Sequence, residues 1–151
     1  HESNRDYFKP VIFISSDELN TLISRLAPVN DAAQQLLADP NADRSPYIRA
    51  MKALIQIMIP EDATDERMNR MTYNEIMELV SGLNESANAL KGYSLAELAS
   101  PEAVPHAEFV SLVSDFNRKF RNLQRIRSQH YKYAKTENGI KYYWLPVEDL
   151  P

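Results

Sequence analysis

Three groups of residues have the types that catalysis uses, but each lacks part of the pattern that its chemistry requires. His106 and Glu108, with Ala107 between them, match the H-x-E of zinc deaminases, which also need a cysteine pair, and this chain has no cysteine. Glu75 and Glu78 lie one helical turn apart, as an acid–base pair would, but such pairs are common on solvated helix faces. Three glycines are too few to build a phosphate-binding glycine loop.

One further segment has the oxygen spacing of a calcium loop. Asp39, Asn41 and Asp43 occupy its first, third and fifth positions, but an EF-hand then needs glycine and glutamate where this chain has Arg44 and Ala50. We therefore interpret the segment as a polar loop. The sequence predicts no catalytic residue, no cofactor and no metal, and we expect that the protein is not an enzyme.

A row of arginines is the strongest candidate for a functional feature. Arg118, Arg121 and Arg125 recur three and four residues apart, so they share one face of a predicted helix that begins near His106. The apolar stripe of this helix lies roughly opposite them and consists of Phe109, Leu112, Val113, Phe116, Phe120, Leu123 and Ile126. Burying three charges would cost several kcal/mol each, so we expect an exposed ridge. Arg127 lies near the stripe and must reach outward or meet an acidic partner.

A β-hairpin is predicted directly after this helix. Asn138 and Gly139 form the strongest short-range hairpin signal, because a type I′ turn needs positive φ at both central residues. The two-residue loop sets Glu137 opposite Ile140, Lys135 opposite Tyr142 and Tyr133 opposite Trp144. One face then carries Tyr131, Tyr133, Tyr142 and Trp144, and the other carries Lys132, Lys141 and Tyr143.

These two elements define the expected contact surface. The predicted partner-binding residues are Arg118, Arg121, Arg125, Lys132, Lys141 and Tyr143. We expect the tyrosine–tryptophan face to cover the helical core, where large rings usually lie. The alternative is a nucleic-acid-binding surface, in which the arginines neutralise phosphates and the rings stack on exposed bases.

The rest of the chain predicts a mostly α fold. Helices are expected at residues 17–27, ended by Pro28, at 31–38 and at 47–59, ended by Pro60. Capping boxes at Thr72 and Ser94 open two more helices. Gly82 either interrupts or ends the first of them, and a short helix is expected at residues 84–90. We expect a single-domain bundle of six or seven helices over residues 10–151, with the long helix and C-terminal β-hairpin at about 105–145. A short strand at 10–14 would extend the hairpin, and residues 1–9 would be flexible.

The amino-acid composition is that of an ordinary globular chain, but the charged residues are unevenly distributed along the sequence. Of the 151 residues, 44% are apolar and 25% charged, and no apolar run is long enough to span a membrane. The chain begins at His1, and we recognise no signal peptide in it. Residues 1–116 hold nine basic and 18 acidic side chains, whereas residues 117–151 hold eight and three. This polarity favours an anionic partner for the basic end, head-to-tail contacts between copies, or attraction within one fold.

The segment from Pro60 to Val80 resembles part of a known group of proteins. An apolar helix ends, an acidic turn follows, and Met71-Thr72 opens a glutamate-rich helix. This layout resembles small helical tailed-phage morphogenesis proteins, notably tail assembly chaperones, although Met71 replaces their usual leucine and the basic hairpin is not part of their pattern. The resemblance covers about 25 residues. It implies a subunit of a larger particle or of its assembly machinery.

Together these observations predict a non-enzymatic protein–protein interaction or assembly component, with a phage structural or morphogenesis protein as the specific form. The expected partner is another protein or further copies of this chain. We expect no membrane association and no small-molecule substrate, and a cytoplasmic or virion-associated location.

Overall fold

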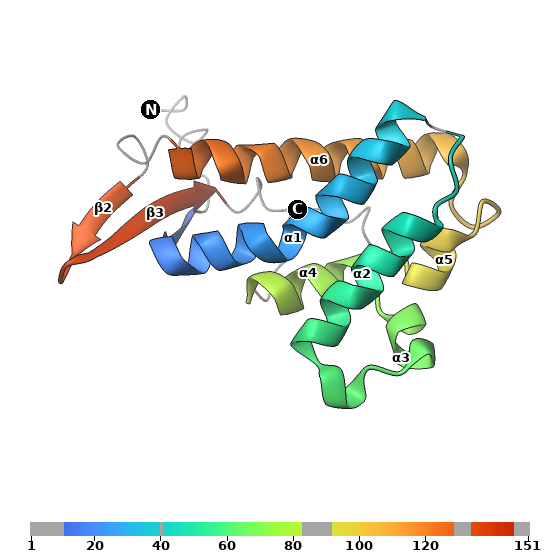
Figure 1. The fold of residues 1–151 in the computed structure, drawn as a ribbon, viewed down its shortest axis with the longest axis horizontal. Coiled ribbons are helices and arrows are strands. Elements are labelled where there is room, and N and C mark those ends of the chain that lie inside the picture. Colours follow the sequence, from blue (N-terminus) through green and yellow to red (C-terminus); the bar gives the residue numbers. More distant parts are fainter. Residues whose placement is uncertain (1–10, 40, 83–91, 129–133, 147–151) are drawn as a thin grey trace, which may run out of the picture.

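The computed structural model describes residues 11–39, 41–82, 92–128 and 134–146. They form a helical body with a small sheet at one end, as predicted (Figure 1). The elements in chain order are β1 (Val11–Ser15), α1 (Ser16–Ala38), α2 (Ser45–Met58), the 3-10 helix η2 (Pro60–Asp62), α3 (Asp65–Arg70), α4 (Tyr73–Ser81), α5 (Leu95–Ala99), α6 (His106–Ser128), β2 (Ala134–Glu137) and β3 (Ile140–Pro146).

Helix α6 forms the spine of the fold. All seven residues of its predicted apolar stripe are buried, and α1 packs along it (Figure 1). Each large apolar side chain that leaves water contributes roughly 1.5–3 kcal/mol. The buried side chains of the described elements join in one hydrophobic core that includes residues of α1, α2, α4, α5, α6 and β3.

The prediction that Pro28 ends a helix is wrong. Helix α1 continues through Pro28 to Ala38, so the two predicted helices are one. A proline inside a helix removes a hydrogen bond and costs about 3 kcal/mol. Here Leu26 and Val29 on either side of it are buried, and their packing outweighs that loss. Figure 1 shows α1 bending part-way along its length, as expected at an internal proline.

The two predicted capping boxes are confirmed, and they lie side by side. The Thr72 hydroxyl accepts the backbone N–H of Glu75, and the same arrangement recurs at Ser94. Thr72 and Ser94 also form an isolated antiparallel bridge, so the starts of α4 and α5 are held together. Gly82 ends α4 with a φ of 75°, which a residue with a side chain rarely adopts. The predicted helix at residues 84–90 lies outside the described residues, and α3 and η2 were not predicted.

The sheet has the strand order β1-β3-β2, and both pairings are antiparallel. Asn138 and Gly139 have φ values of 53° and 78°, as a type I′ turn requires. Glu137 pairs with Ile140 and Lys135 pairs with Tyr142, so the predicted register is confirmed. The N-terminal strand also joins the hairpin as expected, on the far side of β3. Tyr131, Lys132 and Tyr133 lie outside the described residues.

We expected the tyrosine–tryptophan face of the hairpin to cover the helical core, but the structure places the opposite face, with Tyr143, against the helices. Tyr143 is 6% exposed and points into the core with Leu145, whereas Trp144 is 44% exposed on the outer side. Strand β1 explains this orientation. It runs directly into α1, so Ile14 must pack toward the helices, and its pairing with Tyr143 carries that ring inward as well.

Candidate interaction surface

The structure brings together only part of the predicted contact set. Arg118, Arg121 and Arg125 are exposed on one side of α6, and Lys141 is exposed on β3. Tyr143 is buried against the helices, so the structure does not place it on the exposed surface that we expected for it. Lys132, the sixth predicted member, lies outside the described residues.

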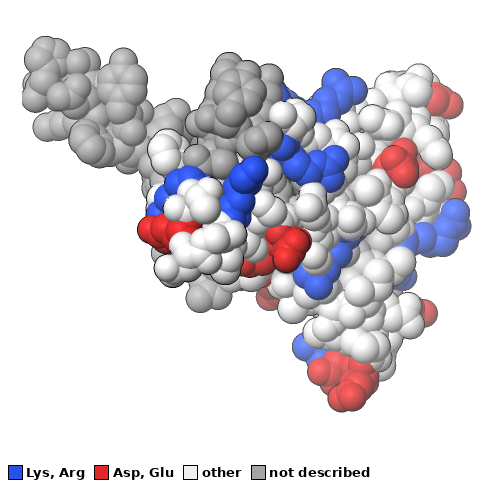
Figure 2. Space-filling model, turned by 60° about the vertical axis from the view of Figure 1, so that its left-hand side comes forward, with Lys and Arg blue, Asp and Glu red and all other residues white. Residues whose placement is uncertain are grey.

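Two members of the arginine ridge, defined here as Arg118, Arg121 and Arg125, have polar partners on their own helix. Arg118 Nη2 lies 2.8 Å from Asp115 Oδ1, and Arg125 Nη2 donates to Asn122 Oδ1 at 3.5 Å. On the face drawn in Figure 2, basic and acidic side chains are interspersed and form no continuous positive area. Within the ridge, the charge of Arg118 is partly balanced by Asp115, and Arg125 has an amide partner in Asn122.

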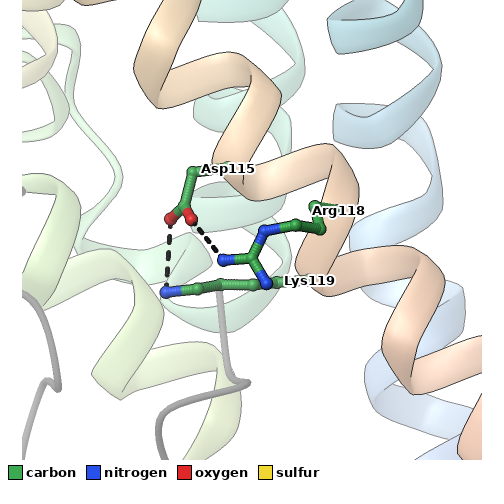
Figure 3. Close-up of polar contacts among 3 residues, drawn as sticks. All are labelled: Asp115, Arg118 and Lys119. Carbon is green, nitrogen blue, oxygen red and sulfur yellow. Dashed lines mark hydrogen bonds and ion pairs between the residues drawn. The ribbon is translucent and has the colours of Figure 1, made fainter.

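The carboxylate of Asp115 also holds a second cation that sequence reasoning missed. Lys119 Nζ lies 3.2 Å from Asp115 Oδ2, and the lysine side chain is only 6% exposed. Figure 3 shows both Arg118 and Lys119 reaching the Asp115 carboxylate, and of the two cations only Arg118 is exposed. A signal was present in the sequence, because Lys119 directly precedes Phe120 of the apolar stripe and follows Asp115 by one helical turn.

Arg127 has the outward path that its position near the stripe requires. Its side chain is exposed, and Nη1 donates to Asn20 Oδ1 at 3.4 Å. This contact joins the last turn of α6 to the first turns of α1. The partner is an amide, so the charge of Arg127 is not neutralised by this contact.

The outer side of the sheet carries a group of exposed rings. We call it the aromatic sheet face and define it as Phe13, Lys135, Ile140, Tyr142 and Trp144. Phe13 and Trp144 are 51% and 44% exposed and meet edge to face, with ring centroids 6.2 Å apart. The Lys135 amine lies 3.8 Å from the centre of the Phe13 ring, within the range of a cation–π contact. Large exposed rings that lie together on a protein surface are typical of an interaction site.

The ionisable groups with shifted pKa values lie mainly in the core. Burial raises the pKa of Tyr47, and it raises the pKa of Tyr73 well above the ordinary value, with further contributions from Tyr47 and Asp115. Within the described residues, no three histidine, aspartate or glutamate side chains are grouped as metal ligands would be. Among the described helices, none is both long and apolar enough to cross a membrane.

One comparison with known proteins decides the family. The model of the TssR C-terminal domain matches residues 44–151, which is more than two thirds of the chain. The chain belongs to the TssR C-terminal domain family. This membership makes it a secretion-system-associated component, related to type VI secretion.

The TssR match begins at the start of α2, yet the fold begins earlier. Helix α1 packs along α6, and β1 pairs with β3, although both precede residue 44. These two elements complete the core and supply Phe13 of the aromatic sheet face. No curated protein and no solved structure matches the chain. The comparisons lend no support to the resemblance of residues 60–80 to tail assembly chaperones.

Replacing Arg118, Arg121 and Arg125 together by glutamate is expected to leave the TssR domain folded. Exposed positions tolerate such exchanges within about 0.5 kcal/mol each, apart from the Arg118–Asp115 pair. Circular dichroism and thermal unfolding measure this. A triple variant that unfolds would show that the ridge is paired within the fold and is not available to a partner.

Proposed function

We propose that the chain is a non-enzymatic assembly component of a secretion system and that it binds a protein partner through the aromatic sheet face. The observation that carries the proposal is the outward orientation of Phe13 and Trp144. Successive residues of a strand point to opposite faces of the sheet, and the neighbours Ile14, Tyr143 and Leu145 of these rings are buried. Both faces of the sheet therefore carry apolar side chains.

The aromatic sheet face and the arginine ridge would contribute differently to such an interface. Rings that enter a dry pocket on a partner supply most of the affinity, often 2–4 kcal/mol for one anchor residue. Exposed arginines at the rim mainly steer association and are weakened by salt. We therefore assign affinity to Phe13 and Trp144 and assign partner orientation to the ridge.

The double variant Phe13→Ser with Trp144→Ser is expected to bind its partner at least 30-fold more weakly. The reason is that the two rings together contribute about 2 kcal/mol or more to binding as anchor residues. The measurement is quantitative recovery of the other secretion-system components with the tagged chain from cells that produce the system. Ile57→Ser is the matched control, since Ile57 is also a large exposed apolar side chain but lies near the end of α2, on a helix outside the sheet. Equal recovery with the double variant and the wild type would contradict the proposal.

Nucleic-acid binding is the second candidate, and the same observation favours it. Exposed rings beside a lysine can stack on bases of single strands. Trp144 is the only tryptophan, so its fluorescence reports directly on this face. Quenching by a single-stranded oligonucleotide that weakens steeply with salt would support this candidate and count against a protein partner at this face.

A further inference from the structure

The turn of the hairpin joins an asparagine to a glycine, and these two residues can react with each other. Asn138 and Gly139 are exposed at the tip between β2 and β3 (Figure 1). Apart from the chain neighbours of Gly139, no described atom lies within 4 Å of the position that a Cβ would occupy there. The backbone nitrogen of Gly139 is therefore sterically accessible. No other asparagine in the sequence precedes a glycine.

The reaction is an intramolecular substitution at the side-chain amide of Asn138. The Gly139 nitrogen attacks Asn138 Cγ, the bond from Cγ to Nδ2 breaks, and ammonia leaves with the proton of the Gly139 N–H. The product is a cyclic succinimide, and water then opens the ring at one of its two carbonyl carbons. Attack of water at Cγ gives aspartate. Attack at the backbone carbon gives isoaspartate, in which the main chain passes through Cβ and Cγ.

The closed turn keeps the two reacting atoms apart. Asn138 has a φ of 53°, as the first central residue of a type I′ turn does, and the ψ of that position is about +30°. At this ψ the Gly139 nitrogen lies on the opposite side of the Cα–C bond from Asn138 Cβ. Attack therefore needs a rotation about that bond, which opens the pair between Glu137 and Ile140. This pair is the last of the ladder, so its opening is a local event.

We propose that Asn138 is a site of spontaneous deamidation and that its isoaspartyl product no longer holds the hairpin tip closed. Isoaspartate adds a main-chain carbon to the two-residue loop, so the loop loses type I′ geometry and the opposition of Glu137 and Ile140 is lost. The aspartyl product keeps the tip closed, because Asp-Gly also suits a type I′ turn. This inference does not depend on the proposed function.

The first test measures the modification itself. The whole chain is incubated at mildly alkaline pH, which promotes loss of the Gly139 amide proton, and its peptides are then analysed by mass spectrometry. The modified fraction at Asn138 is expected to exceed that at Asn41 roughly tenfold or more, because Asn41 is also exposed but is followed by Ala42, whose Cβ hinders attack. Asn138→Gly keeps a Gly-Gly turn and should give no product at the tip. Equal fractions at Asn138 and Asn41 would overturn the inference.

A second pair of variants tests whether the tip must open before it reacts. Ile140→Gly weakens the last pair of the ladder and is expected to speed the reaction at Asn138 roughly fivefold, because strand preferences span about 1 kcal/mol. Ile57→Gly makes the same change at an exposed isoleucine of α2 and should leave the rate at Asn138 unaltered. If Ile140→Gly reacts no faster than the wild type, attack takes place in the closed turn and the opening step is wrong.

The last test examines the products, after chromatography has separated the isoaspartyl and aspartyl forms. Amide hydrogen exchange followed by NMR is expected to be at least tenfold faster at Ile140 in the isoaspartyl form than in the unmodified chain. The aspartyl form and Asn138→Gly should retain the protection of the unmodified chain. An isoaspartyl form that keeps full protection at Ile140 would show that the tip still closes, and the proposed consequence would fail. None of these results changes if the aromatic sheet face proves to bind no partner.

Discussion

Replacing Asp115 by alanine is expected to lower the free energy of unfolding by about 2–3 kcal/mol, because the Asp115 side chain is 25% exposed and the pair lies between an exposed ion pair and a fully buried one. The substitution leaves the ammonium group of Lys119 within the protein, and this lysine side chain is only 6% exposed. Arg118, the other cation on this carboxylate, has a side chain that is 61% exposed and can return to water. The cost therefore comes from Lys119. Urea denaturation of the purified chain measures it.

Two further variants isolate that cause. Arg118→Met removes the exposed half of the arrangement and is expected to cost less than about 1 kcal/mol. Adding Lys119→Met to Asp115→Ala removes the stranded charge and should restore most of the loss, because apolar replacements of buried ion pairs are often close to neutral. If Asp115→Ala costs no more than Arg118→Met, the Lys119 amine reaches water in solution, and the buried-pair interpretation is wrong.

Alkaline pH is expected to destabilise the protein steeply, beginning near pH 10. Burial raises the pKa of Tyr47, and it raises the pKa of Tyr73 well above the ordinary value of 10. An unfolded chain loses both phenolic protons above pH 10, whereas the folded chain keeps them. Stability is therefore fully present below pH 10 and falls above it by roughly 1 kcal/mol per pH unit for each tyrosine. Between pH 10 and 12 the two together should remove roughly 3–5 kcal/mol.

Thermal or urea unfolding at a series of pH values between 8 and 12 tests this dependence. Tyr47→Phe should reduce the slope above pH 10 by about half. At neutral pH it should cost little, because the Tyr47 hydroxyl is buried and has no hydrogen-bond partner among the described residues. An unaltered slope in Tyr47→Phe would show that this ring ionises within the fold.

Local signals predicted the elements that depend on neighbouring residues. The hairpin register follows from Asn138 and Gly139 alone, since a type I′ turn fixes which residues are opposed. The stripe of α6 follows from three- and four-residue spacing, and the starts of α4 and α5 follow from Thr72 and Ser94. In each case the residues that predict the element are close in sequence to the residues that they contact.

Features that depend on tertiary packing could not be predicted in the same way. Pro28 is a helix terminator by its own chemistry, and only the burial of its neighbours against α6 keeps α1 continuous. The alternation of the hairpin separates Tyr143 from Trp144 but does not say which faces the core. That choice depends on β1, more than 120 residues away in the sequence. The cationic side chains of Lys119 and Arg44 are buried because Asp115 and the Leu98 carbonyl are there to receive them.

The pairing of the first strand with the last has a mechanical consequence. Val11 and Pro146 are partners, so the polypeptide enters and leaves the described fold at adjacent points of one ladder. A load that pulls those two points apart acts across the ladder, perpendicular to the strands, and separates one residue pair at a time. Sliding antiparallel strands lengthwise would instead break all their hydrogen bonds at once. A force applied between Val11 and Pro146 would therefore first separate β1 from β3. Ile14 and Tyr143 would then be exposed while the contacts between α1 and α6 still hold.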